Sequence, residues 1–141
     1  MKVLVTGAAG QLGHDVLNEL SSRGYEAVGT DLAPEYSGVQ DGTPVTMLPY
    51  VQMDITDQEK ADQVIVDLAP DAVIHCAAWT AVDLAEDEDK QEKVRAINAG
   101  GTENIARACK KVGCKMMYIS TDYVFNGQGT DCLLYTSPSP R

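Results

Sequence analysis

The fold of this chain is decided by the stretch Gly7-Ala8-Ala9-Gly10-Gln11-Leu12-Gly13, which follows a short apolar run at residues 2–6. Gly7 permits a tight turn from strand to helix, Gly10 lets the backbone approach a pyrophosphate, and Gly13 allows close packing of the helix on the strand. The N-terminus of the helix that follows offers free N–H groups and a partial positive charge to phosphates. The stretch therefore predicts a dinucleotide-binding turn at the start of the chain.

An acidic residue stands about 20 positions after this turn, as such a site requires. Asp31 ends a second apolar run, where a carboxylate can accept hydrogen bonds from an adenosine ribose and repels a 2′-phosphate. No arginine follows it immediately, so Asp31 favours NAD(H) over NADP(H), although a turn or cap aspartate is the alternative. Asp54 and Ile55 close a third apolar run near the expected adenine, and a simple loop carboxylate explains Asp54 equally well.

Strand and helix patterns alternate along the rest of the chain. Apolar runs predict strands at residues 2–6, 25–30, 47–53, 71–76 and 115–119. Helices are predicted from residue 12 to a stop at Gly24, from a capping box at residues 56–59 to Leu68, and from about Glu86 to a stop at Gly113. The strands read as apolar runs, as expected when both sheet faces are covered. The pattern predicts an α/β fold with a doubly wound parallel sheet, a Rossmann-like NAD(P)-binding domain.

Composition narrows the function further. The 141 residues suffice for one domain, and 44% of them are hydrophobic. A formal net charge of −10 argues against nucleic acid and anionic membrane surfaces as partners. No apolar run is long enough to span a bilayer, and the N-terminal apolar stretch is too short for a signal peptide, so a cytoplasmic protein is expected.

The cysteines and histidines show no metal-ligand spacing, so no metal site is predicted from them. The four cysteines are expected to be free thiols, and His14 and His75 are interpreted as structural or exposed because neither has a triad partner. The acidic cluster at residues 83–89 is interpreted as the solvated start of the long helix, with a metal site as the remote alternative.

Two segments that follow predicted strands carry candidate site residues. The first, Cys76-Ala77-Ala78-Trp79-Thr80, has small residues that leave room for a cofactor. Trp79 and Thr80 are then candidates to flank the nicotinamide ribose, with simple packing as the alternative for Trp79. The second, Ser120-Thr121-Asp122-Tyr123-Val124-Phe125, brings a hydroxyl, a carboxylate and a phenol together. Such a set suits a place where a nucleotide cofactor meets its substrate.

Four segments in this order resemble the dTDP-4-dehydrorhamnose reductase family of extended short-chain dehydrogenases/reductases. They are the glycine stretch, the run from Cys76 to Glu86, Ile97-Asn98-Ala99, and the run from Ser120 to Phe125. The glycine motif is common to the superfamily, whereas the second and fourth segments are more specific to the reductases. The resemblance covers residues 1 to about 130 and corresponds to the N-terminal half of such an enzyme.

The resemblance implies NAD(P)H-dependent reduction of the 4-keto group of dTDP-4-dehydro-L-rhamnose to dTDP-L-rhamnose. Thr121 matches the catalytic hydroxyl that hydrogen-bonds the reacting oxygen, and Asp122 matches a sugar-contacting position. Positions that contact the cofactor are matched by Gly10, Gln11, Leu12, Asp31, Ala78, Trp79 and Thr80. Family members pair as dimers, in some cases around Mg²⁺, but no residue here matches such a Mg²⁺ site convincingly.

One departure from the superfamily pattern concerns the acid–base couple, a tyrosine followed four positions later by a lysine. The six tyrosines are each followed at that spacing by another residue, namely Gly29, Gln40, Asp54, Asp122, Gly127 and Ser139. Residues 1–131 are therefore expected to be an incomplete dinucleotide-binding domain, truncated after the fifth strand and inactive alone. Apolar residues at 73–74 or 116–119 should then be exposed on one sheet face.

The last ten residues lack periodicity and fit no element of this fold. The amino acids of residues 132–141 are also what the DNA string TGT CTC TTA TAC ACA TCT CCG AGC CCA CGA encodes, a string typical of read-through into a transposon-based sequencing adapter. The segment is therefore predicted to be a non-native tail, with a genuine disordered tail as the alternative.

Two other functions remain open at this point. An NAD-dependent sugar-nucleotide epimerase or dehydratase shares the expected fold, although the segment around Thr121 favours a reductase. A non-catalytic nucleotide-binding subunit, like the regulatory subunit of methionine adenosyltransferase, also resembles this family.

Overall fold

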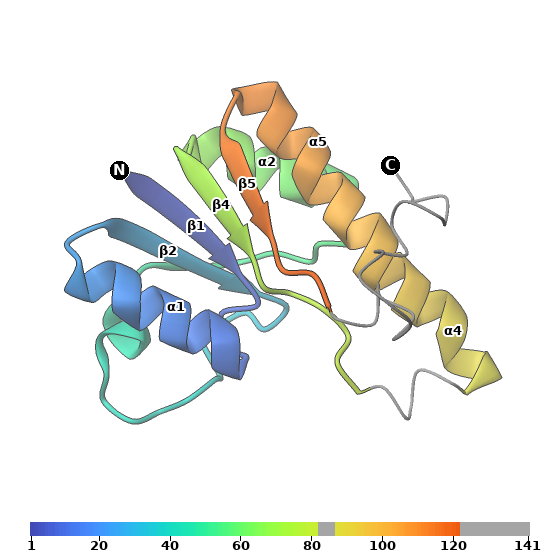
Figure 1. Ribbon diagram of the computed structural model, residues 1–141, viewed down its shortest axis with the longest axis horizontal. Helices are drawn as coiled ribbons and strands as arrows, with labels where there is room; N and C mark the ends of the chain where they lie inside the picture. The colour runs from blue at the N-terminus through green and yellow to red at the C-terminus, as the bar shows by residue number, and fades with distance from the viewer. Residues whose placement is uncertain (82–86, 122–141) are drawn as a thin grey trace, which may run out of the picture.

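Five parallel strands form one sheet in the computed structural model, which describes residues 1–81 and 87–121 (Figure 1). The sheet has the order β3-β2-β1-β4-β5. Its strands are β1 (Lys2–Thr6), β2 (Glu26–Asp31), β3 (Tyr50–Gln52), β4 (Ala72–His75) and β5 (Lys115–Tyr118). The strand order reverses between β1 and β4, and ligands of such sheets bind outside the carboxyl ends of the strands at that point. The predicted doubly wound parallel sheet is confirmed.

Different helices cover the two faces of the sheet, as Figure 1 shows. One face packs against α1 (Gln11–Ser22) and the 3₁₀ turn η1 (Pro44–Met47). The opposite face packs against α2 (Gln58–Leu68) and α5 (Thr102–Val112). Alternate residues of each strand therefore enter separate apolar cores on the two sides.

The third strand is shorter than predicted. The expected strand at residues 47–53 is wrong except for Tyr50–Gln52. Pro44 begins η1 instead, and Pro49 has no N–H to donate to a ladder. Proline chemistry therefore overrides the apolar pattern in this segment.

The start of α2 differs by one residue from the predicted capping box. Asp57 is the N-cap, and its Oδ1 accepts a hydrogen bond from Lys60 N at 3.0 Å. The Thr56 hydroxyl donates to Asp54 Oδ1 at 2.7 Å and so does not cap the helix. Either side chain can serve as an N-cap, and the turn at Asp54 decides between them.

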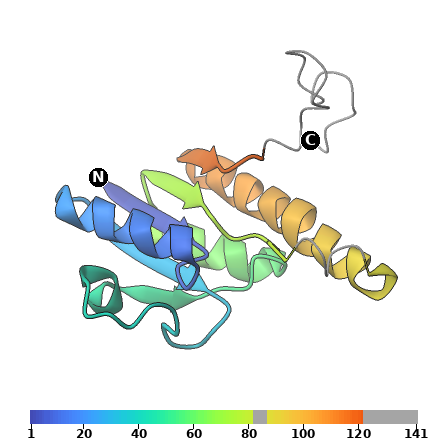
Figure 2. The same cartoon turned by 60° about the horizontal axis from the view of Figure 1, so that its bottom comes forward.

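The predicted long helix is confirmed from residue 88 onward but is not a regular α-helix throughout. It consists of α4 (Glu88–Arg95), the π-helical segment η2 (Ala96–Gly101) and α5, which run on as one rod in Figure 2. Gly113 ends it in the left-handed conformation at φ 71°, as predicted. The expected start at Glu86 lies outside the described residues.

The expected exposure of apolar residues, at 73–74 or at 116–119, is confirmed for residues 117–119 but not for Met116, which packs against the core. Met117, Tyr118 and Ile119 are 58%, 55% and 42% exposed. Val73 is fully buried because it faces the core under α2 and α5, and Ile74 is half-buried.

The structure bears on the remaining predictions only where it describes the residues concerned. Cys76, Cys109 and Cys114 are free thiols, as predicted, whereas Cys132 lies outside the described residues. The predicted tail at residues 132–141 also lies outside them. No helix within 1–81 and 87–121 has the length and apolar character needed to cross a membrane.

Candidate functional site

A cavity of about 840 Å³ opens at the carboxyl ends of β1, β2 and β4. Its wall contains every cofactor-contacting position predicted from the sequence, namely Gly7, Gly10, Gln11, Leu12, Gly13, Asp31, Asp54, Ile55, Ala78, Trp79 and Thr80. The predicted catalytic Thr121 is not among the lining residues; it follows β5 and is exposed. Asp122 lies outside the described residues. The structure thus brings together the predicted cofactor positions in one place.

The floor of the cavity is the glycine turn between β1 and α1. Gly7 has φ 71°, and a Cβ built there would lie 2.7 Å from Ala77 N, so no larger residue fits. A Cβ on Gly13 would lie 2.0 Å from Gly7 O, which shows how closely α1 packs on the turn. Among residues 1–81 and 87–121, no side chain caps the N-terminus of α1, which leaves its first N–H groups available to an anion.

Asp31 and Asp54 lie at one end of the cavity. The Asp31 carboxylate accepts hydrogen bonds from Ala9 N at 2.9 Å and Leu32 N at 2.8 Å. Asp54 Oδ1 accepts from the N–H of Thr56 at 2.8 Å and from its hydroxyl. Both carboxylates are therefore oriented by neighbouring backbone while still lining the cavity.

Thr30 supplies an independent test of whether this cavity fits a polar ligand. Thr30 is 1% exposed and lines the cavity, and its hydroxyl has no hydrogen-bond partner within the described part of the chain. A buried hydroxyl without a partner is costly, and a ligand with donors or acceptors would remove that cost. Thr30 was not predicted as a site residue, since a threonine inside a strand carries no local signal of this kind.

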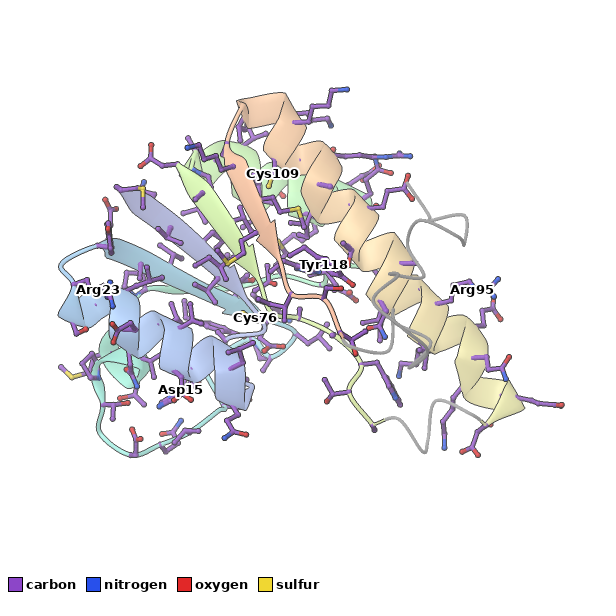
Figure 3. The ribbon with its side chains drawn as sticks, in the orientation of Figure 1. Asp15, Arg23, Cys76, Arg95, Cys109 and Tyr118 are labelled. Atoms are coloured by element: carbon purple, nitrogen blue, oxygen red, sulfur yellow. The ribbon has the colours of Figure 1, made fainter. Side chains whose placement is uncertain are left out.

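The opposite end of the cavity is built by the segment after β4, which Figure 3 locates through Cys76. Asn98 holds Trp79 by its backbone: its Oδ1 accepts from Trp79 N at 2.7 Å and its Nδ2 donates to Trp79 O at 3.3 Å. The Trp79 indole donates to Ala81 O at 3.0 Å, and Lys93 Nζ lies 5.7 Å from the ring centroid. Trp79 is therefore half-buried and held by hydrogen bonds at its backbone and its indole.

The π-helical segment η2 positions Asn98 and was missed by the sequence analysis. A Cβ on Gly101 would lie 2.5 Å from Ile55 Cδ1, so this glycine lets the segment lie directly on a cavity residue. Single π turns in helices occur frequently at functional sites. The pair Gly100-Gly101 inside a predicted helix was the available signal, because glycine is unfavourable there.

Both histidines are buried, in agreement with a structural interpretation. His14 is 4% exposed, and its Nδ1 lies 2.7 Å from the Tyr36 hydroxyl on the α1 side of the sheet. His75 is 1% exposed, and burial lowers its pKa to about 4. An imidazole with that pKa is neutral at physiological pH.

Within residues 1–81 and 87–121, no three His, Cys, Asp or Glu side chains lie close enough together to hold a metal ion.

Comparison with known proteins identifies the family. The model of the RmlD substrate binding domain family matches residues 1–140. The chain belongs to this family. Its resemblance to the dTDP-4-dehydrorhamnose reductases is thereby confirmed.

Members of the RmlD substrate binding domain family and related proteins match most of this chain. The dTDP-4-dehydrorhamnose reductase of Streptomyces griseus is 37% identical over 126 residues, which are 89% of this chain and 35% of that protein. The crystal structure of the Bacillus anthracis dTDP-4-dehydrorhamnose reductase, in complex with NADP, has a TM-score of 0.72 and 38% identity, covering 91% of this chain and 39% of that one.

The chain is also similar, over nearly its whole length, to a protein whose name describes it as a subunit. Methionine adenosyltransferase 2 subunit beta of Rattus norvegicus is 31% identical over 139 residues, which are 99% of this chain and 38% of that protein. The chain therefore spans between a third and two fifths of the length of these relatives.

Proposed function

We propose that this chain is the NAD(P)H-binding part of a keto-sugar-nucleotide reductase. The intact protein is proposed to reduce the 4-keto group of dTDP-4-dehydro-L-rhamnose to give dTDP-L-rhamnose. One observation carries the proposal: eleven positions selected from the sequence as cofactor contacts line a single cavity beside an uncapped helix N-terminus. The similarity to dTDP-4-dehydrorhamnose reductases supports the choice of substrate class.

Each part of the cavity suits a different part of a dinucleotide. The N-terminus of α1 and the glycine turn would hold the pyrophosphate. Asp31 would accept hydrogen bonds from the adenosine ribose, and Asp54 with Ile55 would border the adenine. Trp79 and Thr80 would flank the nicotinamide ribose. When bound, the cofactor supplies the hydride for the reduction.

The residues after β5 would serve the reacting sugar. We propose that the Thr121 hydroxyl donates a hydrogen bond to the oxygen that gains negative charge, and that Asp122 contacts the sugar. The 141 residues contain no tyrosine with a lysine four positions later. Without that proton donor the rate should fall by roughly 10²–10⁴-fold, so this chain is proposed to bind cofactor with little or no turnover.

We propose NADH as the preferred cofactor. The Asp31 carboxylate is oriented by Ala9 N and Leu32 N and would face a 2′-phosphate with like charge. The Bacillus anthracis relative was solved with NADP, so the two nucleotides have to be compared directly on this chain.

Calorimetric titration of the full chain with NADH, NADPH and ADP tests the proposal. We expect saturable binding of all three, tightest for NADH, and no measurable turnover of a dTDP-linked 4-keto sugar. Trp79 is the only tryptophan and lines the cavity, so energy transfer from it to NADH gives a second readout. A folded chain that binds no dinucleotide would contradict the cofactor assignment, and efficient turnover would contradict the inactivity.

A non-catalytic role remains the second candidate, because the similarity to methionine adenosyltransferase 2 subunit beta extends over 99% of this chain. Mixing the chain with a methionine adenosyltransferase catalytic subunit and measuring complex formation separates the two. Binding of that subunit without any binding of a dTDP-sugar by a longer form of this protein would favour the subunit role.

A further inference from the structure

His75 lies at the end of β4, between two threonines that come from different elements. The parallel register places it beside Thr6 of β1 and Tyr118 of β5. Its Nδ1 lies 2.7 Å from the Thr6 hydroxyl, and its Nε2 lies 3.1 Å from the Thr102 hydroxyl at the start of α5. The Tyr118 ring stacks on the imidazole at 6.3 Å between centroids. Figure 3 shows Tyr118 on β5.

The directions of these hydrogen bonds can be assigned from the groups at the two ends. The Thr102 hydroxyl donates to Asn98 O at 2.8 Å, and a carbonyl can only accept, so Thr102 must accept from His75 Nε2–H. A neutral imidazole then has a bare Nδ1, which accepts the Thr6 hydroxyl proton. The Thr6 oxygen in turn accepts from Ala77 N at 3.2 Å. Every donor in this chain of bonds meets an acceptor.

This chain of hydrogen bonds connects Thr6 with Asn98, and each of these two residues also holds part of the segment at residues 77–79, which lines the cavity. At one end Thr6 holds Ala77 by its N–H. At the other end the Asn98 side chain holds both the N–H and the carbonyl of Trp79. His75, at the carboxyl end of β4, connects these two contacts, because it bonds to Thr6 of β1 on one side and, through Thr102, to Asn98 of η2 on the other.

Residues 77–79 cannot shift without changing the shape of the cavity. Ala77 N lies where a Cβ on Gly7 would be only 2.7 Å away, so the segment lies directly against the glycine turn. Ala77, Ala78 and Trp79 all line the cavity. A movement of this segment therefore changes the wall opposite the helix N-terminus.

We propose that His75 is a positioning residue, which through Thr6 and Thr102 holds residues 77–79 in the place that a dinucleotide's nicotinamide end requires. The inference rests on the proposed cofactor function of the cavity. Burial supports it by keeping the imidazole neutral, since a protonated Nδ1 could not accept from Thr6. Removing one member leaves buried polar groups unpaired, which costs more than the lost bond alone.

A matched set of threonine variants tests the proposal in the full chain. Thr102→Val keeps the shape but removes the hydroxyl, and Thr102→Ser restores it. Thr46→Val is the control, because Thr46 makes the same kind of bond to a backbone carbonyl, Thr43 O at 2.8 Å, on the opposite side of the sheet. Far-UV circular dichroism verifies that each variant is folded.

The readouts are Trp79 emission without cofactor and the dissociation constant for NADH. We expect Thr102→Val to red-shift the emission, increase its quenching by acrylamide and weaken NADH binding about tenfold. Thr102→Ser and Thr46→Val should behave like the unchanged chain. Wild-type emission and affinity in Thr102→Val, or equal effects in Thr46→Val, would overturn the proposal.

The emission is measured without NADH, so it decides the positioning role even if the chain binds no dinucleotide, which would count against the proposed function alone. Nitrogen-15 NMR of the unchanged chain adds a test that needs no variant. We expect the Nε2–H tautomer at His75, and the Nδ1–H tautomer would contradict the assigned bonds.

Discussion

The two ends of the cavity are built in different ways. At the proposed adenosine end, Asp54 bonds to Thr56 and Asp31 bonds to Leu32 over one or two residues of sequence, although Ala9 and Asn104 also reach this end from farther along the chain. At the proposed nicotinamide end, the bonds from Thr6 to His75 and from His75 to Thr102 span 69 and 27 residues. The first end is largely a product of local turns, whereas the second exists only when β1, β4 and α5 have packed together.

The largest effect is expected at Gly13, which lies in the turn that both ends share. In Gly13→Ala the new Cβ would lie 2.0 Å from the backbone oxygen of Gly7, and neither backbone can move easily. We expect a loss of about 3 kcal/mol in the free energy of unfolding and no NADH binding. Urea unfolding and calorimetry measure both.

Gly100→Ala is the control for this change, because nothing lies within 4 Å of its Cβ position. It should leave stability and NADH affinity nearly unchanged. NADH binding by Gly13→Ala at wild-type affinity would show that the close contact on Gly7 does not shape the turn.

The next effect is a loss of folding stability at acid pH, which we expect from the buried His75. The pKa of His75 is lowered by burial from 6.5 to about 4, so the unfolded chain takes up the proton before the folded chain does. The stabilisation is complete above the unfolded pKa and is lost as pH falls through this interval, by roughly 3 kcal/mol in total.

Urea unfolding between about pH 7 and about pH 4.5 measures this loss, and His75→Gln supplies the comparison because glutamine does not titrate. The difference between the two slopes isolates the imidazole from other groups. Identical pH dependence in both chains would show that His75 does not carry the effect.

Two asparagines allow the ends to be weakened separately. Asn98 holds Trp79, and Asn104 donates to Ile55 O at 2.9 Å near the expected adenine. Asn98→Ala should weaken NADH about tenfold and leave ADP binding unchanged, whereas Asn104→Ala should weaken both nucleotides by a similar, smaller factor. Calorimetry with the two ligands gives the result, and an equal loss of ADP and NADH affinity in Asn98→Ala would contradict the assignment of the ends.

The smallest effect is expected for selectivity at the adenosine end. Asp31→Asn removes the negative charge and retains an oxygen acceptor, so the affinity for NADPH relative to NADH should rise about fivefold. Asp54→Asn is the matched control and should not alter that ratio, since Asp54 also lines the cavity but is proposed to border the adenine. An unchanged ratio in Asp31→Asn would mean that another residue sets the preference.

The same division explains how far the sequence analysis reached. The glycine turn, Asp31 and the strands around them were predicted because their signals lie within a few residues of one another. The predicted length of the third strand was too great because the apolar pattern continued through Pro49. The N-cap of α2 is Asp57 because the Thr56 hydroxyl bonds to Asp54. These errors concern the boundaries of two elements, and they do not change which residues line the cavity.

The contacts that the sequence did not predict at the proposed nicotinamide end have another origin. Asn98 entered the sequence analysis only as part of a resembling segment, and His75 was described only as structural or exposed. Neither Thr6 nor Thr102 was considered, because a hydroxyl acquires meaning only from what the fold places beside it. The partner of His75 along β1 is 69 residues away, and no local pattern indicates such a pair.

The sequence by itself determined the α/β sheet, the glycine turn at a helix N-terminus and the acidic residue at the end of β2. Short-range sterics and backbone hydrogen bonding dictate these features, so the residue types at their spacing suffice to predict them. Only the tertiary structure decided that Thr6, His75, Thr102 and Asn98 form one chain of bonds around residues 77–79. That arrangement depends on strand register and on where η2 packs, both set by the burial of side chains far apart in the sequence.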